Sequence, residues 1–524
     1  MKICTSILGQ LLRHPFRDVV VDDQRTWKAW QIYAGALKLA AWIEETTDRQ
    51  HVAFMLPTSG LSPIAILATW ILGRTTVPLN YLLRREERDY VIRDAGIDTV
   101  ISVGPMLERF DPLPDDVTVL KLEDLKGRGG KLPKPRRAIR RPEDHVAVLL
   151  YTSGTSGKPK GVMLTSGNLM SNVDQADDLV GFRGSGHKLL GVIPQFHSFG
   201  LTVLTLLPLA LGLQVVFTAR FMPRRILELL EEHRPTVLVL IPSMYAALLS
   251  QKSAHKEQFE SLELVVSGGE PLPRSVADGY EERFGVRINE GYGLTETAPA
   301  TNICMPHHWR RGSVGPPLKD LEVRIVGEDE RILGPGEEGE IRFRGPNVMK
   351  GYYNLPEETA AVFDRDGFFK TGDMGRVDED GHVYITGRIK EMLIVGGENV
   401  FPREIEEVLN AHPAVHASAV VALKDDVRGE LPLAFVVLEE DATPTETELR
   451  GWCRERLAAY KVPRDIRVRQ ELPRGPTGKV LRRELNESIP CEGWPTGGGG
   501  NGKDDGVGDG AAGSANESDR GGAA

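Results

Sequence analysis

The sequence predicts an α/β fold, with a large N-terminal domain of two parallel-sheet subdomains plus a small β-barrel, followed by a small α+β C-terminal domain. Short apolar runs alternate with helical patterns up to about residue 386, which is typical of β–α–β units and parallel sheets. Between Val314 and Phe343, short alternating strands are separated by glycine turns, which indicates an antiparallel sheet or barrel. A compact stretch of mixed helices and strands then runs from Gly387 to about Leu485.

Each predicted strand is a short apolar run beside turn residues, and each predicted helix repeats its apolar residues at helical spacing. In the large domain the strands are 52–56, 77–79, 99–102, 145–151, 189–193, 215–217, 237–240, 264–266, 321–326 and 339–343, and the helices are 62–72 and 84–94. In the small domain we expect helices 402–411 and 445–456 and strands 417–422 and 433–437.

One stretch, 189–219, has no charged side chain and raises the question of a membrane span. A spanning helix needs about 20 mostly apolar residues. Pro194, Pro208 and Gly212 interrupt the stretch, so we expect a buried strand, a buried helix and another strand, and no transmembrane segment.

Composition excludes several classes of protein. A net charge of −10 and a pI of about 5.8 argue against a general nucleic-acid binder. The cysteines (Cys4, Cys304, Cys453 and Cys491) are not spaced as metal or redox pairs, so neither a zinc site nor a disulfide framework is predicted. No signal-peptide pattern begins the chain, and cytoplasm is the expected compartment. Residues 487–524 are Gly-rich towards their end and are predicted to be a disordered tail.

The segment Tyr151–Val162, YTSGTSGKPKGV, is the strongest functional signal. Its glycines allow backbone N–H groups to approach an anion, its hydroxyls add donors, and its lysines add positive charge for phosphate. It is not a Walker A loop, because Thr152 replaces the first glycine and Pro159 replaces the magnesium-binding hydroxyl. We therefore predict that this loop binds a nucleotide polyphosphate. The alternative is a basic surface loop with no ligand.

Further motifs carry polar residues at turns after apolar runs. His197 follows a buried strand, where ligands lie in open α/β sheets, although a core histidine with satisfied hydrogen bonds is the alternative. In Glu290–Thr297, Tyr292 can stack on a base and Glu296 can hold magnesium, or the segment is a turn with a solvated acid. The remaining candidates are the turn Ser267–Pro271, Asp373 for ribose hydroxyls, Arg388, Lys390 and the turn lysine Lys479.

Together and in this order, the motifs closely resemble those of the adenylate-forming superfamily of acyl-CoA synthetases, beetle luciferases and peptide-synthetase adenylation domains. The resemblance covers about residues 1–486. It implies that ATP and Mg²⁺ activate a carboxylic acid to an acyl-adenylate. The thiol of CoA, or of holo acyl carrier protein, then takes the acyl group, with release of AMP and pyrophosphate.

The resemblance also assigns roles to single residues. The implied catalytic residues are Lys479, Thr295, Glu296 and His197, and the implied metal ligands are Thr155 and Glu296. The residues implied to bind ATP or CoA are Thr152, Ser153, Gly154, Thr155, Ser156, Gly157, Lys158, Lys160, Gly268, Gly269, Glu270, Pro271, Glu290, Gly291, Tyr292, Gly293, Asp373, Arg388, Lys390, Gly396, Gly397 and Glu398. Domain 1–386 would bind the nucleotide, 387–390 would be a hinge, and the mobile domain 391–486 would rotate to exchange Lys479 for the 396–402 segment.

The segment Phe196–Phe199 lacks the acid with which peptide-synthetase domains bind an amino group, so an amino-acid substrate is disfavoured. The apolar run Phe199–Ala210 either lines an acyl tunnel or is core. The residues there are most like those of fatty-acid-activating members, with CoA or acyl carrier protein as acceptor. The sequence is also compatible with an aryl-acid ligase, a luciferase or a non-catalytic binding protein, and peripheral membrane contact stays open.

Overall fold

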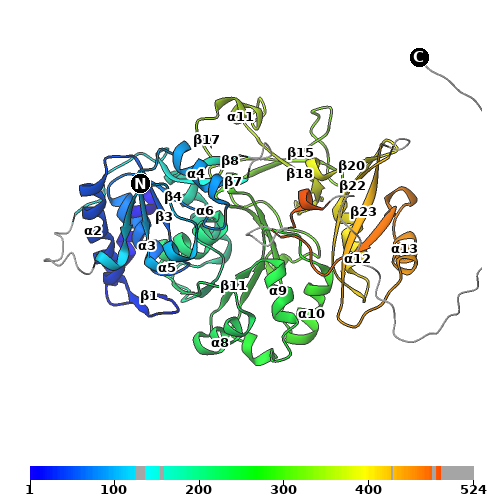
Figure 1. Cartoon of the computed structure of the whole chain (residues 1–524), viewed down its shortest axis with the longest axis horizontal. Coiled ribbons are helices and arrows are strands. Elements are labelled where there is room, and N and C mark those ends of the chain that lie inside the picture. The colour runs from blue at the N-terminus through cyan, green and yellow to red at the C-terminus, as the bar shows by residue number, and fades with distance from the viewer. Residues whose placement is uncertain (126–135, 154–157, 426–428, 475–479, 486–524) are drawn as a thin grey trace, which may run out of the picture.

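The computed structural model describes residues 1–125, 136–153, 158–425, 429–474 and 480–485. Four predicted loop residues (Gly154, Thr155, Ser156 and Gly157), together with Lys479 and the glycine-rich tail, lie outside the described residues. The large N-terminal domain occupies most of the molecule, and the C-terminal domain lies at one end of it (Figure 1).

The first sheet has seven strands in the order β17-β8-β7-β4-β3-β5-β6. Strands β7, β4, β3, β5 and β6 run parallel, whereas β8 and β17 are antiparallel additions at one edge. Buried apolar residues on both faces of the interior strands fit a sheet covered by helices on each side. The strands are β3 (His51–Met55), β4 (Thr75–Pro78), β5 (Thr99–Ser102), β6 (Thr118–Lys121), β7 (Val146–Ser153), β8 (Pro159–Thr165) and β17 (Gly351–Tyr352).

The second sheet has eight strands in the order β14-β13-β12-β11-β9-β10-β1-β2. Its interior is parallel, and the two edge pairs, β13–β14 and β1–β2, are antiparallel. The predicted parallel sheets are therefore confirmed for the interiors, and the antiparallel edges are an addition. The strands are β1 (Asp18–Val21), β2 (Thr26–Lys28), β9 (Lys188–Gly191), β10 (Gln214–Phe217), β11 (Val237–Leu240), β12 (Leu264–Ser267), β13 (Asn289–Gly293) and β14 (Ala300–Ile303).

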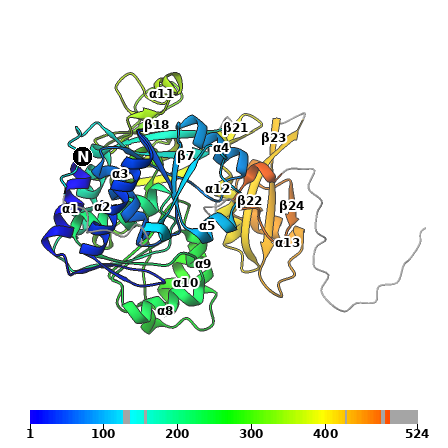
Figure 2. The same cartoon turned by 60° about the vertical axis from the view of Figure 1, so that its left-hand side comes forward.

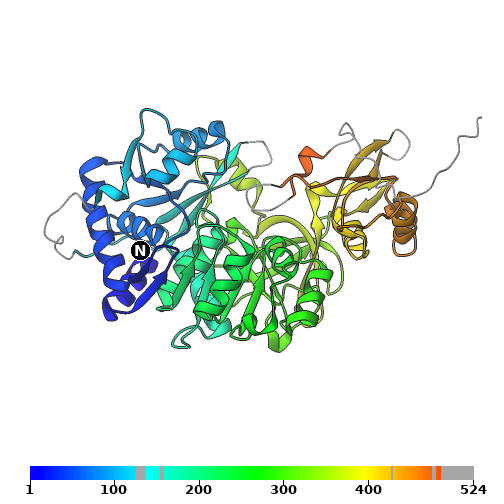
Figure 3. The same ribbon diagram turned by 60° about the horizontal axis from the view of Figure 1, so that its bottom comes forward.

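Helices cover these sheets, and the two subdomains lie side by side (Figure 3). Helix α6 shows how the sequence sets a helix. The Thr165 side chain accepts a hydrogen bond from the Asn168 backbone N–H at 3.0 Å, and Gly181 ends the helix in the left-handed region with φ 74°. The helices of the large domain are α1 (Lys2–Arg13), α2 (Ala29–Thr46), α3 (Leu61–Ile71), α4 (Arg85–Asp94), α5 (Gly104–Arg109), α6 (Ser166–Val180), α7 (Leu207–Leu211), α8 (Pro223–His233), α9 (Pro242–Leu249), α10 (Arg274–Phe284) and α11 (Pro356–Ala361).

The uncharged stretch 189–219 folds as predicted into strand, helix and strand. Between β9 and β10 lies a π-helical segment, η2 (Phe199–Leu206), which runs into α7. Among the described residues, no helix combines the length and the apolar character that a membrane crossing requires. The 3₁₀ segments are η1 (Leu122–Leu125), η3 (Lys256–Phe259), η4 (Thr295–Thr297), η5 (Pro306–His308), η6 (Ile389–Glu391), η7 (Ala459–Lys461) and η8 (Arg482–Glu484).

The third sheet is small and antiparallel, in the order β15-β16-β18-β19, as the alternating pattern after residue 314 predicts. Its inner face packs Ile325, Ile341 and Phe343 into a separate apolar cluster. The strands are β15 (Glu322–Val326), β16 (Gly339–Arg344), β18 (Phe369–Val377) and β19 (Val383–Arg388).

The C-terminal domain has its own core between a five-stranded sheet and two helices (Figure 2). It contacts the large domain through Arg403, whose Nη1 donates to the Ile385 carbonyl at 2.6 Å. At Gly387 a Cβ atom would lie 2.3 Å from Phe401, so only glycine lets this ring approach β19. The elements are β20 (Leu393–Val395), β21 (Glu398–Val400), α12 (Pro402–Asn410), β22 (Val415–Asp425), β23 (Gly429–Leu438), α13 (Glu446–Arg454) and β24 (Asp465–Val468).

Candidate active site

The carboxyl ends of the parallel strands β9, β11, β12 and β13 open onto one large cavity of about 1520 Å³. Ligands of open α/β sheets lie at this edge. Ser267 of β12 is in register with Glu290 of β13, which brings the turn after β12 beside the strand that carries Tyr292. Gly268, Gly269 and Glu270 line the cavity, as do Gly291, Tyr292 and Gly293.

Tyr292, Asp373 and Arg388 form one cluster, although they are far apart in sequence. Asp373 on β18 is directly opposite Arg388 on β19, and the Arg388 Nε lies 2.7 Å from an Asp373 oxygen. The Tyr292 hydroxyl donates to the other carboxylate oxygen. Burial and the nearby Asp373 charge raise the pKa of Tyr292 well above its ordinary value, so that the hydroxyl stays protonated and donates.

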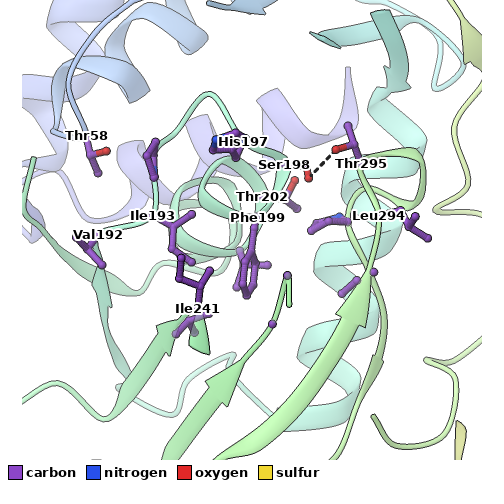
Figure 4. A pocket seen from close by; sticks show the side chains of 18 of the residues that line it. Thr58, Val192, Ile193, His197, Ser198, Phe199, Thr202, Ile241, Leu294 and Thr295 are labelled. Atoms are coloured by element: carbon purple, nitrogen blue, oxygen red, sulfur yellow. Dashed lines mark hydrogen bonds between the residues drawn. The ribbon is translucent and has the colours of Figure 1, made fainter. Parts of the chain in front are cut away.

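Thr295 is held at the cavity by a tight turn. A Cβ atom at Gly293 would lie 2.0 Å from the Pro299 carbonyl oxygen, so the close approach of the two backbones requires glycine. The short η4 follows, and the hydroxyl oxygens of Thr295 and Ser198 lie 3.3 Å apart (Figure 4). Ser198 comes from the start of the π-helical region, so this contact joins the β13 turn to the wall of the cavity.

Glu296 lies between the strand edge and the start of the phosphate loop. Its Oε1 accepts a hydrogen bond from the Tyr352 hydroxyl at 2.9 Å. Lys160 Nζ lies 5.2 Å from the centre of the Tyr352 ring, within the range of a cation–π contact. All three residues line the cavity, which therefore has a carboxylate and an ammonium group on the same part of its wall.

The two described ends of the segment Tyr151–Val162 lie on two paired strands. Thr152 of β7 is opposite Lys160 of β8, and both line the cavity. Lys158 is exposed, and its Nζ lies 5.7 Å from the centre of the Tyr90 ring rather than on the cavity wall. Ser153 lies on β7, and the loop tip is outside the described residues.

His197 lies beside Ser198 on the cavity wall, which is apolar below it at Ile193 and Ile241 (Figure 4). Its ring packs against Phe196, with the ring centres 4.5 Å apart, and Phe196 in turn packs against Tyr81. The apolar wall is formed by the ends of β9 and β11, the following helical segments and β12. Its residues are Val192, Ile193, Phe199, Val203, Val239, Ile241, Met244 and Val266.

The predicted C-terminal site residues lie in different places. Arg388 and Lys390 line the cavity, whereas Gly396, Gly397 and Glu398 are exposed on the β20–β21 hairpin and do not line it. Pro271, Glu290 and Asp373 also lie outside the cavity wall, and Asp373 is buried directly behind Tyr292 and Arg388.

Glu290 is half-buried near Arg403 and Glu407 of α12, and it is expected to make stability depend on pH. Burial raises the pKa of its carboxyl to about 7, although the Arg403 charge and the Leu272 N–H favour the ionised form. A raised carboxyl pKa contributes stability at low pH, and this contribution is lost as pH rises through about 7.

We therefore expect Glu290→Gln to flatten the pH profile of stability. Between about pH 5 and pH 8, the free energy of unfolding of the native sequence should fall by up to about 2 kcal/mol more than that of the variant. Urea titrations at several pH values measure the difference. Parallel profiles for the two proteins would contradict the burial of an acidic proton at this position.

Sequence reasoning missed two residues of the cavity, Ser198 and Tyr352. Ser198 stands inside the motif around His197, so its hydroxyl was a signal that could have been used. Tyr352 gives no such signal, because it lies on a strand of two residues whose pairing with β8 brings it to Glu296.

Comparisons with known proteins agree with this geometry. A family profile described as AMP-binding enzyme matches residues 9–353, and one described as AMP-binding enzyme C-terminal domain matches residues 404–479. The long-chain-fatty-acid–CoA ligase of Bacillus subtilis is 34% identical over 508 residues, covering 87% of this chain and 89% of that protein. The feruloyl-CoA synthase of an Amycolatopsis species is 35% identical over 441 residues, covering 83% and 88%.

One similar structure was solved with its ligands bound. The o-succinylbenzoate CoA synthetase of Bacillus subtilis, in complex with ATP and a magnesium ion, superimposes with a TM-score of 0.79. It is 30% identical and covers 92% of this chain and 98% of that one. On the extent of these matches, the chain belongs to the AMP-binding enzyme family, whose fold of a large adenylate-forming domain and a small C-terminal domain it shares.

Proposed function

We propose that this chain is an AMP-forming acid–CoA ligase, which activates a fatty acid to an acyl-adenylate and transfers the acyl group to CoA. Membership of the AMP-binding enzyme family supports the adenylation and the transfer to CoA. The similar synthetase bound to ATP and magnesium supports the two cofactors. The relatives are named for a fatty acid, for a feruloyl group and for o-succinylbenzoate. The choice of a fatty acid as the substrate is therefore argued from the cavity of this chain.

One observation carries the proposal. A single cavity joins Tyr292 and Arg388, which both contact Asp373, to the apolar wall around Phe199 and Ile241. Ligand pockets are usually about 300–1,000 Å³, and this larger cavity has room for a nucleotide and an acyl chain together. Each buried CH₂ of such a chain would contribute about 0.8 kcal/mol.

The charges of the cavity suit the first step. A carboxylate and the ATP phosphates repel each other, and the Lys160 ammonium offsets that repulsion as the acid attacks the α-phosphorus and pyrophosphate leaves. Asp373 would accept hydrogen bonds from the ribose hydroxyls, because each of its oxygens has a further lone pair. Tyr292 would pack against the base.

The residues present also fit a magnesium ion, which prefers carboxylate oxygens. Glu296 lines the cavity, and among the described residues only its Oε1 is engaged, by Tyr352. Glu296 would therefore hold the ion. When bound, magnesium neutralises part of the negative charge of the phosphates. Thr155, the other proposed ligand, lies outside the described residues.

We also propose that the C-terminal domain, 391–486, rotates about 387–390 between the two steps. Lys390 lies in η6, directly between β19 and the first strand of the small domain. Rotation would bring the exposed Gly396–Glu398 hairpin to the cavity, where a thiol attacks the acyl carbonyl and AMP leaves.

Lys390→Pro is expected to slow this rotation, because proline holds φ near −65°. Thioester formation should fall by about tenfold or more, while pyrophosphate release in a single turnover changes less. Rapid-quench measurement of both products tests this, with Lys424→Ala, an exposed position on β22, as the control. An unchanged overall rate would count against a hinge at Lys390.

Thr202 distinguishes a fatty acid from an acid with a polar tail. Its side chain lines the cavity, is 1% exposed, and its hydroxyl has no hydrogen-bond partner among the described residues. For a wholly apolar chain, Thr202→Val should keep kcat/KM within about twofold and add about 1 kcal/mol of stability. A loss of tenfold or more in kcat/KM for the best acid would indicate a polar substrate group at Thr202.

The acceptor is proposed to be CoA rather than an acyl carrier protein. A carrier protein would need a basic docking surface, for which the sequence offers Arg454, Arg456, Lys461, Arg464, Arg467 and Arg469. Three of these form ion pairs with nearby acids: Arg456 with Glu455, Lys461 with Glu404, and Arg467 with Asp465. Local pairing of this kind weakens the case for a docking surface.

Pyrophosphate release across a panel of acids tests the function. The panel contains a long-chain saturated acid, a hydroxycinnamic acid and a short dicarboxylic acid, each with CoA and with holo carrier protein. We expect the highest kcat/KM with the long-chain acid and CoA. A higher kcat/KM with the hydroxycinnamic acid would contradict a fatty acid as the substrate. No pyrophosphate release with any acid would contradict the proposed ligase activity.

A further inference from the structure

Three metal-ligating side chains meet away from the cavity, at the junction between the second and third sheets. Cys304 directly follows β14, His308 is the last residue of η5, and His382 directly precedes β19. One ligand atom from each lies within 4.8 Å of the other two. Cys304 is 0% exposed and His382 is 4% exposed, whereas His308 is partly exposed.

Hydrogen bonds indicate that the His382 ring is the tautomer that can bind a metal ion through Nε2. The Ser313 hydroxyl donates its proton to the Val383 carbonyl at 3.0 Å, and its oxygen lies 3.1 Å from His382 Nδ1. Because a hydroxyl has one proton, Nδ1 of the histidine must be the donor in this contact. The lone pair is then on Nε2, and such outer hydrogen bonds orient metal-ligating histidines.

The other two groups are also prepared for a ligand. His308 Nδ1 is buried and has no hydrogen-bond partner among the described residues, and its ring meets His382 edge-on at 5.4 Å between centres. An unsatisfied buried polar atom is costly, and a bond to a metal ion would satisfy it. The Cys304 sulfur accepts the Arg310 backbone N–H at 3.5 Å, and its thiol proton points to the Arg310 carbonyl at 3.9 Å, so a metal ion would take the place of this proton.

We propose that Cys304, His308 and His382 bind one Zn²⁺ ion, with a water molecule as the fourth ligand. One thiolate and two imidazoles are a typical zinc ligand set. Bonds of about 2.0–2.3 Å in a tetrahedron require ligand atoms about 3.5 Å apart, so the three side chains would rotate towards one another on binding the ion. The thiol proton is released to solvent on binding.

The ion would tie together the two walls of the nucleotide site. Cys304 follows the strand that pairs with β13, where Asn302 is opposite Tyr292. His382 precedes β19, whose far end carries Arg388. Zinc would therefore brace the junction of these sheets, and its binding is measurable without any ligase activity.

The test uses untagged full-length chain that has been stripped with a chelator and reloaded with Zn²⁺ or Co²⁺. We expect one equivalent of zinc by elemental analysis, a thiolate-to-cobalt charge-transfer band, and a higher Tm for the zinc form than for the stripped form. His308→Gln should weaken zinc binding by about 100-fold or more and abolish the zinc-dependent rise in Tm. His307→Gln and Cys453→Ser are the matched controls and should bind as the native sequence does.

Cys304→Ser removes the cobalt band, and the partly exposed His308 provides a variant that does not disturb the buried core. The proposal is overturned if the native chain retains less than half an equivalent of zinc after dialysis. It is equally overturned if His308→Gln retains zinc and shows the cobalt band as the native chain does.

Discussion

Replacing Asp373 by Asn is expected to lower kcat/KM for ATP by about a hundredfold or more. The Asp373 side chain is 3% exposed and receives both the Arg388 guanidinium, at 2.7 Å, and the Tyr292 hydroxyl. The amide removes the negative charge, leaves Arg388 without its partner carboxylate and presents N–H donors where ribose hydroxyls also donate. Because the Arg388 side chain is 49% exposed, the main loss is in binding: a hydrogen bond to a charged group contributes about 1.5–3 kcal/mol, and losing two to the ribose hydroxyls would lower affinity by about a hundredfold or more.

Initial rates of pyrophosphate release over a range of ATP concentrations measure this effect, and the loss should fall largely on KM. Glu322→Gln is the matched control, because it breaks the exposed Glu322–Arg344 pair in the same sheet. We expect this control to change kcat/KM less than twofold, as is usual for a surface ion pair. Equal effects of the two substitutions would show that Asp373 has no role in binding the nucleotide.

Replacing Lys479 by Ala is expected to reduce adenylation by about a thousandfold and to spare the second half-reaction. Charge that develops on the α-phosphoryl group is stabilised by a positioned cation, and the loss of one such group costs about 10²–10³ in rate. Lys479 lies outside the described residues, so this expectation rests on the resemblance of its motif and on family membership.

The two half-reactions separate this role from a general defect. Pyrophosphate release reports adenylation, and thioester formation from a supplied acyl-adenylate reports transfer to CoA. Lys424→Ala, at an exposed position of the same domain, controls for loss of surface charge. If Lys479→Ala impairs both steps to the same degree, the residue does not act on the α-phosphate.

Much of the fold could be predicted because the interior strands are short, apolar and separated by helices. Strands β5 and β11 begin and end at the predicted residues, since turn residues flank an unbroken apolar run. The antiparallel edges could not be predicted. Strand β17 has two residues, which is too short for any period, and β14 follows a glycine-rich motif that resembles a loop.

The candidate site divides in the same way. Tyr292, Thr295 and Glu296 stand in one motif on one turn, so their shared position follows from the chain itself. The pairing of Asp373 with Arg388 depends on the register of two strands, and the motif order suggested it only through the family resemblance. The Cys304–His308–His382 cluster could not be found from cysteine spacing, because its third member is distant in sequence.

The register of β18 against β19 has a consequence for how such an enzyme can diverge. A strand that slips by one residue turns every side chain to the opposite face, so a one-residue shift of β19 against β18 would separate Arg388 from Asp373 even in a well-folded protein. The apolar wall of the cavity is formed by separate strand ends and the η2 segment, and each of its residues can be replaced without changing the others. Under the proposed function, the choice of acid could therefore change one residue at a time while the nucleotide contacts stay constant.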